Sequence, residues 1–255
     1  MKVGLIPPRG LERYALRYVF HLALAQECTR SEYIVAYQNR LEHHFLVIDN
    51  GAYEGKMVDP FEVLGYAYAL HANEIVLPDT LRQAETTCEQ VSKWIRKMVY
   101  PSETLALFAV AQGRRLTDFR YCVDVFAKHK SIATIGIPKH MPVTLGQLHT
   151  RIDFANWIEQ VYPNRFKLHF LGANEQWPRE VAAATKYTSV RSIDTSLPFS
   201  YTAAGKRIDS GVKGIIRPRD YFRTNYGQLL SGRLLDHNVN TYMRWANAEA
   251  PIGGV

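Results

Sequence analysis

Short apolar runs, rich in β-branched residues, alternate along this chain with longer stretches whose apolar residues recur at helical spacing. The runs typical of strands are residues 2–6, 33–37, 45–48, 74–77, 105–109, 132–135, 167–171 and 189–193. The stretches typical of helices are residues 11–28, 59–70, 81–99, 116–128, 145–162 and 178–186. Strands that alternate with helices form a parallel sheet. About eight of them in 255 residues predict an α/β fold, a (β/α)8 barrel rather than an open sheet.

We expect residues 1–200 to form this barrel as the catalytic domain. Residues 201–255 are less regular and are expected to form a small basic C-terminal extension packed on the barrel. No Pro/Gly/Ser-rich linker, low-complexity tract or internal repeat divides the chain. The G-x-G-x-x-G and P-loop patterns are missing, so the sequence indicates no nucleotide cofactor.

The composition is that of a soluble globular protein, with 47% apolar and 22% charged residues. No apolar run approaches the roughly 20 residues that span a bilayer, and the N-terminus lacks the layout of a signal peptide. Cys28, Cys88 and Cys122 are isolated and odd in number, which favours a reducing cytoplasm over a disulfide framework. Without Cys-x-x-Cys or His-x-x-x-His spacing, we expect no zinc site.

The net charge of +7 favours a polyanionic partner. Part of the excess is local, in Lys206, Arg207, Lys213, Arg217, Arg219 and Arg223. Aromatic residues interleave with them at Tyr201, Tyr221, Phe222 and Tyr226. Basic and aromatic side chains on one stretch suit phosphate contact with base stacking, and we interpret the six basic residues as a nucleic-acid-binding surface. A solvated surface explains the same stretch equally well.

Carboxylates follow two of the predicted strands. Asp49 comes after the run 45–48, and Asp194 ends the last run within Ser192-Ile-Asp-Thr-Ser-Leu-Pro-Phe199. The C-terminal ends of the strands of a barrel share one rim, and barrel enzymes keep their active sites there. Two facing carboxylates suit chemistry at a glycosidic carbon, because one can attack while the other transfers protons.

Further polar groups and glycines follow the other strands. They are Asp79 after the fourth predicted strand, Gln112 and Gly113 after the fifth strand, Gly136 and Ile137 at the end of the sixth strand, and Gly172 after the seventh strand. Asp and Gln can pair with the edge of a purine-like base, and glycines let a flat ligand approach the backbone. Tyr53 or Phe199 could supply a stacking face.

Each of these residues also has a structural explanation. Asp49-Asn-Gly is a common turn, and Asp79 and Asp194 could cap helices. His169, inside a strand, is expected to be a satisfied core residue. The order in which all the polar ends fall on one rim favours a functional site.

This ordered set resembles the tRNA-guanine transglycosylase superfamily, (β/α)8 barrels that exchange guanine for a 7-deazaguanine. Asp49-Asn-Gly-Ala-Tyr-Glu54 resembles its Asp-Ser-Gly-Gly/Ala-Phe-Gln motif, Pro78-Asp79-Thr80 its acidic base-recognition turn, and Gln112-Gly113 its Gln-Gly-Gly. Gly136-Ile137 resembles its glycine-led turn, Leu171-Gly172 its Leu/Met-Gly, and Ile193-Asp194-Thr-Ser-Leu-Pro198 its nucleophile motif Phe-Asp-x-x-x-Pro. The resemblance covers roughly residues 1–200.

The differences between this sequence and the family pattern favour one class of nucleic-acid substrate over another. The family's Cys-x-Cys-x-x-Cys…His zinc site is missing, and the chain is much shorter than a tRNA enzyme. Arg114 stands at the second glycine of Gln-Gly-Gly, and Glu54 replaces a glutamine. A small member without zinc resembles most the phage branch that inserts 7-deazaguanines into DNA.

The resemblance implies an enzyme, and the cysteine usage and the missing cofactor and zinc patterns predict that it is cytoplasmic and needs no cofactor or metal. Asp194 would attack C1′ of a guanine nucleotide flipped out of double-stranded DNA, and Asp49 would protonate the leaving base and deprotonate the incoming 7-deazaguanine. The base-binding residues would be Asp79, Gln112, Gly113, Gly136, Ile137, Gly172 and Tyr53. No membrane partner is expected, and a homodimer is left open. The alternatives are exchange in RNA, a two-carboxylate glycoside hydrolase and a non-catalytic nucleic-acid-binding module.

Overall fold

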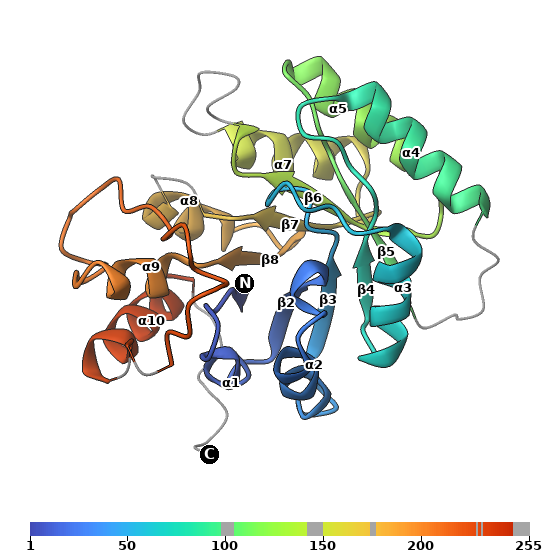
Figure 1. Ribbon diagram of the computed structural model, residues 1–255. Coiled ribbons are helices and arrows are strands. Elements are labelled where there is room, and N and C mark those ends of the chain that lie inside the picture. The colour runs from blue at the N-terminus through green and yellow to red at the C-terminus, as the bar shows by residue number, and fades with distance from the viewer. Residues whose placement is uncertain (98–104, 142–149, 174–176, 228, 231, 247–255) are drawn as a thin grey trace.

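The computed structural model describes residues 1–97, 105–141, 150–173, 177–227, 229–230 and 232–246 (Figure 1). Within them, eight parallel strands form one sheet in the order β1-β8-β7-β6-β5-β4-β3-β2. The strands are β1 (Lys2–Leu5), β2 (Phe20–Leu24), β3 (Phe45–Asp49), β4 (Glu74–Val76), β5 (Ala106–Val110), β6 (Ile132–Pro138), β7 (Lys167–Leu171) and β8 (Val190–Thr195). The end strands β1 and β2 lie next to each other, so the sheet is a nearly closed barrel and the predicted (β/α)8 fold is confirmed.

Helices cover the outside of the strands (Figure 1). They are α1 (Glu12–Ala15), α2 (Ser31–Gln38), α3 (Pro60–Ala69), α4 (Ala84–Lys97), α5 (Leu116–Phe126), α7 (Thr150–Val161), α8 (Trp177–Ala184), α9 (Leu197–Ala203) and α10 (Arg233–Trp245), with a 3₁₀ helix, η1, at Ala25–Glu27. The start of α3 shows why the sequence predicted it well. The Asp59 carboxylate accepts a hydrogen bond from the Phe61 N–H at 2.8 Å, and Pro60 occupies the first helical position. Residues 98–99 and 145–149, the ends of two predicted helices, lie outside the described residues.

The prediction for the first β/α unit was wrong. The strand predicted at 33–37 belongs to α2, and the helix predicted at 11–28 contains α1, β2 and η1. Every residue of β2 is buried, so its apolar run lacks the alternation of a half-exposed strand. In α2, Tyr33, Ala36 and Tyr37 are buried at helical spacing, although Tyr, Ile and Val favour strands when considered alone.

The apolar core forms two layers. The outer layer lies between the strands and the helices and includes Leu46, Ile48 and Ile193. The inner layer fills the barrel and consists of Ile6, Phe20, Leu22, Leu24, Val47, Val76, Phe108 and Val110. Successive side chains of a strand point to opposite faces of the sheet. Asp49 therefore shares the inner face with Val47, and Asp194 lies on the face opposite Ile193.

The chain after β8 returns to the barrel. Helix α10 packs against α9 and α8, and the stretch between α9 and α10 contains neither a helix nor a strand among its described residues. The Tyr221 hydroxyl donates a hydrogen bond to the Ile6 carbonyl, and the Tyr226 N–H donates to the Arg9 carbonyl at 2.8 Å. These bonds attach the stretch to the loop after β1. Helix α9 spans residues on both sides of position 200, and the division at 200/201 stays a prediction.

Candidate active site

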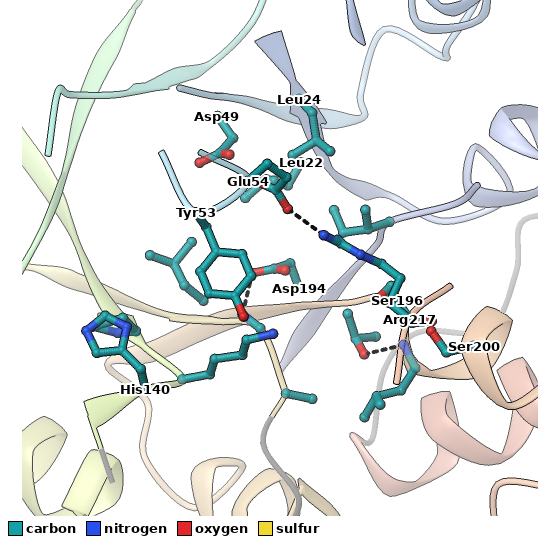
Figure 2. A pocket seen from close by; sticks show the side chains of 18 of the residues that line it. Leu22, Leu24, Asp49, Tyr53, Glu54, His140, Asp194, Ser196, Ser200 and Arg217 are labelled. Carbon is teal, nitrogen blue, oxygen red and sulfur yellow. Dashed lines mark hydrogen bonds and ion pairs between the residues drawn. The ribbon is translucent and has the colours of Figure 1, made fainter. Parts of the chain in front are cut away.

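A cavity of about 440 Å3 opens at the C-terminal ends of the strands. This volume lies within the range of small-molecule sites. The structure brings six of the predicted catalytic and base-binding residues to its wall: Asp49, Tyr53, Asp79, Gln112, Gly172 and Asp194. Figure 2 shows Asp49 and Asp194 around this cavity together with Tyr53, Glu54 and Arg217.

Asp194, in β8, is held by two nitrogen atoms, those of Gly172 N–H and His169 Nε2. Its Oδ1 accepts a hydrogen bond from the Gly172 N–H at 2.8 Å and lies 3.1 Å from His169 Nε2. Gly172 has a φ of +68°, which favours glycine, and its carbonyl accepts from Arg151 Nη1 at 2.9 Å. The side chain of Asp194 is 14% exposed, so the carboxylate is fixed in orientation and still reachable from the cavity.

Asp49, at the end of β3, has a different environment. Its Oδ2 accepts a hydrogen bond from the Gly51 N–H at 3.2 Å. Burial raises the pKa of Asp49 well above its usual value, and the carboxylates of Glu54 and Asp79 raise it further. Asp49 can therefore hold a proton where an exposed carboxyl would have lost it.

Asp79 belongs to a network of amides at the ends of β3, β4 and β5. Asn50 Nδ2 donates to Asp79 Oδ1 at 2.8 Å, and Gln112 Nε2 donates to Asp79 Oδ2 at 2.6 Å. Gln112 Oε1 accepts from the Arg82 N–H at 3.0 Å, which fixes the amide's orientation. Burial raises the pKa of Asp79 to about 6, although the two amide donors oppose this shift. The prediction did not include Asn50, which also donates to the Leu77 carbonyl at 2.7 Å.

Three of the predicted base-binding residues do not line the cavity. A Cβ on Gly136 would lie 2.5 Å from Phe108 Cε2, so this glycine is required by packing inside the barrel. Its carbonyl accepts from the Ala111 N–H at 3.0 Å. Ile137 is fully buried in the outer layer, and a Cβ on Gly113 would meet Asp118 of α5 at 2.5 Å. The cavity is lined instead by Pro138, the last residue of β6, and by Lys139 and His140, which follow it.

Aromatic and basic groups frame the mouth. Tyr53 is half-exposed on the wall, and Lys139 Nζ lies 4.3 Å from its ring centroid. Phe199, the other predicted stacking residue, is buried and packs edge-on against Tyr14. Lys213 and Arg217 line the cavity. The other residues of the basic stretch, Lys206, Arg207, Arg219 and Arg223, are exposed and lie outside the lining.

Sequence reasoning missed two histidines of this region. His140 lies two residues after the end of β6, and burial lowers its pKa to about 4, so its ring is neutral at physiological pH. His169 is buried, as expected of a core residue, yet it contacts Asp194. Its position two residues before the end of β7, on the face that points into the barrel, was the available indication.

Comparison of the sequence with models of protein families and with curated proteins found no match. Across the described ranges, no three His, Cys, Asp or Glu side chains are grouped so that they could hold a metal ion. None of the helices described combines the length and apolar content that crossing a bilayer requires.

Proposed function

We propose that this protein is a DNA-guanine transglycosylase, which exchanges a guanine base of DNA for a 7-deazaguanine such as 7-cyano-7-deazaguanine. The observation that supports the proposal most is the contrast between two carboxyl groups in one cavity. Asp194 is held by hydrogen-bond donors and remains accessible, whereas burial and two neighbouring carboxylates raise the pKa of Asp49. Two carboxyl groups whose environments differ in this way suit a nucleophile and an acid–base catalyst.

The first half of the reaction uses both groups. Asp194 attacks C1′, the C1′–N9 bond breaks with its electron pair moving to the base, and Asp49 donates its proton to the departing guanine. The product is a glycosyl ester on Asp194. The second half reverses these steps, because Asp49, now a carboxylate, removes the N9 proton of the incoming base, which attacks C1′ and releases Asp194. Water must be kept from the ester, since hydrolysis would leave an abasic site.

The amide network can distinguish guanine from other bases. Gln112 Nε2 uses one hydrogen on Asp79, which leaves its second hydrogen for the O6 of guanine. Asp79, as a carboxylate, can accept from the N1–H and N2–H edge. Asn50 Nδ2 donates one hydrogen to Asp79 and the other to the Leu77 carbonyl, so none is left for a base. The role of Asn50 is therefore to position Asp79.

Double-stranded DNA suits the surroundings of the cavity. The chain carries a net charge of +7, and Lys213 and Arg217 lie at the mouth. C1′ cannot be reached inside a stacked duplex, so the target nucleotide must be flipped out at a cost of a few kcal/mol. Ile216, between these basic residues on the same segment, is 83% exposed. An apolar side chain in this position could fill the gap that a flipped base leaves.

The proposal is tested by a base-exchange assay. The protein is incubated with 7-cyano-7-deazaguanine and either duplex DNA or tRNA, and the nucleosides are then analysed by mass spectrometry. We expect a modified deoxynucleoside that is lost in Asp194→Asn and retained in Asp209→Asn, an exposed acid outside the cavity. A modified ribonucleoside would keep the mechanism and move the substrate to RNA. No product from either nucleic acid would count against the proposal, and full activity of Asp194→Asn would refute the nucleophile.

A further inference from the structure

A chain of polar side chains runs through the otherwise apolar barrel and ends at Asp194. His169 Nε2 lies 3.1 Å from Asp194 Oδ1, and His169 Nδ1 lies 2.8 Å from the Ser192 hydroxyl. Arg191 Nε donates to the same hydroxyl at 3.3 Å. Both Nη groups of Arg191 donate to Glu74, at 2.7 and 2.8 Å. The imidazole is fully buried and packs between the rings of Phe20 and Phe108.

An irregularity in β8 makes this chain possible. Leu168 pairs with Val190 and His169 pairs with Ser192, so β8 has one extra residue, Arg191, opposite β7. A β-bulge of this kind changes the direction of a side chain. Arg191 and Ser192, although adjacent, therefore both reach groups inside the barrel, Glu74 in one case and His169 in the other.

The hydrogen bonds determine which nitrogen of His169 carries the proton. An unprotonated Nε2 would face the lone pairs of the Asp194 carboxylate, whereas Nε2–H donates to it. Nδ1 then accepts, and Ser192 can donate to it because Arg191 Nε–H already supplies a donor to the Ser192 oxygen. Burial lowers the pKa of His169, which favours the neutral ring.

We infer that His169 is a positioning residue that orients the Asp194 carboxylate as its neutral Nε2–H tautomer. Both hydrogen bonds that Asp194 accepts from the described residues end on Oδ1. Oδ2 is therefore left to form the bond to C1′. The catalytic part of this inference rests on the proposed function, whereas the tautomer does not.

Nitrogen NMR of the full chain tests the tautomer without any substrate. Two-bond correlations between the ring protons and both ring nitrogens distinguish the neutral tautomers and the imidazolium. The His169 signals are identified by their loss in His169→Gln. We expect Nε2–H in the wild type at pH 7 and a mixture of tautomers in Ser192→Ala, which removes the donor to Nδ1. Nδ1–H or an imidazolium in the wild type would overturn the inference.

A pair of substitutions tests the effect on catalysis. The side-chain amide of His169→Gln reaches the place of Nε2, whereas that of His169→Asn reaches only the place of Nδ1. Both substitutions remove the buried ring, so a merely structural role would impair them equally. We expect His169→Gln to stay within a few-fold of wild-type kcat and His169→Asn to lose about a hundredfold, with KM for the base unchanged in both.

The outcomes separate the two proposals. Equal activity of the two variants would show that His169 does not position the nucleophile. A wild type that exchanges no base would contradict the proposed function but not the tautomer of His169. The nitrogen NMR spectrum would still show whether His169 donates from Nε2–H to Asp194. Thermal unfolding of each variant shows whether a lost activity reflects a lost fold.

Discussion

Glu54 Oε1 and Arg217 Nη2 lie 3.1 Å apart and join the loop after β3 to the segment before α10 across the cavity mouth (Figure 2). The guanidinium of Arg217 also lies 4.9 Å from the ring centroid of Phe222 and 5.5 Å from that of Tyr221. These contacts hold the segment that carries Lys213 and Ile216 over the cavity. An arginine from the predicted DNA-binding stretch thus has an acidic protein partner.

A double-mutant cycle measures what this ion pair contributes. We expect Glu54→Gln and Arg217→Gln to lower the free energy of unfolding, with a coupling of about 1 kcal/mol, because the pair is only partly buried. Urea denaturation of the wild type, both single variants and the double variant supplies the four values. Additive effects of the two substitutions would show that the pair is not a stabilising contact.

The Glu54→Gln variant also tests the acid–base role of Asp49. Glu54 raises the pKa of Asp49, so removing this negative charge lowers that pKa. In the proposed mechanism Asp49 must be protonated to donate to the leaving guanine, so activity should fall as the pH rises through its pKa. We expect the alkaline limb of the kcat/KM profile to move to lower pH in Glu54→Gln. An unmoved limb, or one displaced to higher pH, would assign the proton transfer to another group.

The base-binding role proposed for Asp79 predicts that base binding depends on pH. Its pKa is about 6, and only the carboxylate can accept hydrogen bonds from N1–H and N2–H together. Affinity for 7-cyano-7-deazaguanine, measured by calorimetry, should weaken as the pH falls through about 6 and stay constant above it. Asp79→Asn should bind the base poorly at every pH, while Asp209→Asn should follow the wild type. Affinity that is flat from pH 5 to pH 8 would contradict this role.

Ile216 provides a test for duplex opening. We expect Ile216→Ala to lower exchange in duplex DNA by about tenfold, because nothing then fills the gap beside the flipped nucleotide. A mismatch opposite the target guanine weakens the stack and should restore most of the activity. Leu229→Ala is the matched control, since Leu229 is 66% exposed and lies outside the cavity. Equal loss on paired and mismatched DNA would argue against a wedge.

Local patterns predicted the parts of the fold and site that depend on local physics. The cap at Asp59, the eight-strand barrel and the gathering of Asp49, Asp79 and Asp194 at one rim all follow from periodicity and from where strands end. Glycine residues predicted the site less well than the carboxylates did. Gly172 needs its positive φ at the cavity, whereas Gly136 is explained by a neighbouring phenylalanine, and their sequence context does not distinguish the two.

The remaining features depend on contacts between distant parts of the chain. Glu54 and Arg217 form an ion pair although they are 163 positions apart in the sequence, and Arg191 and Glu74 do so at a separation of 117. The strand β2 was missed because its burial on both faces removes the alternation that marks a strand. The partnership of His169 with Asp194 requires the register of two neighbouring strands, which periodicity within one strand does not contain.

The bulge at Arg191 has a consequence for how this protein tolerates change in length. Val190 and Ile193 both lie in the outer layer, an odd number of positions apart, which strict alternation forbids. The extra residue reconciles them, and Asp194 faces inward as a result. Removing a single residue between these two positions would restore strict alternation, with Val190 and Ile193 still in the outer layer and Asp194 still facing inward, but Arg191 or Ser192 would be lost from the polar chain. A shortened β8 would then keep the Asp194 carboxylate at the cavity and lose one of the side chains that support His169 from behind.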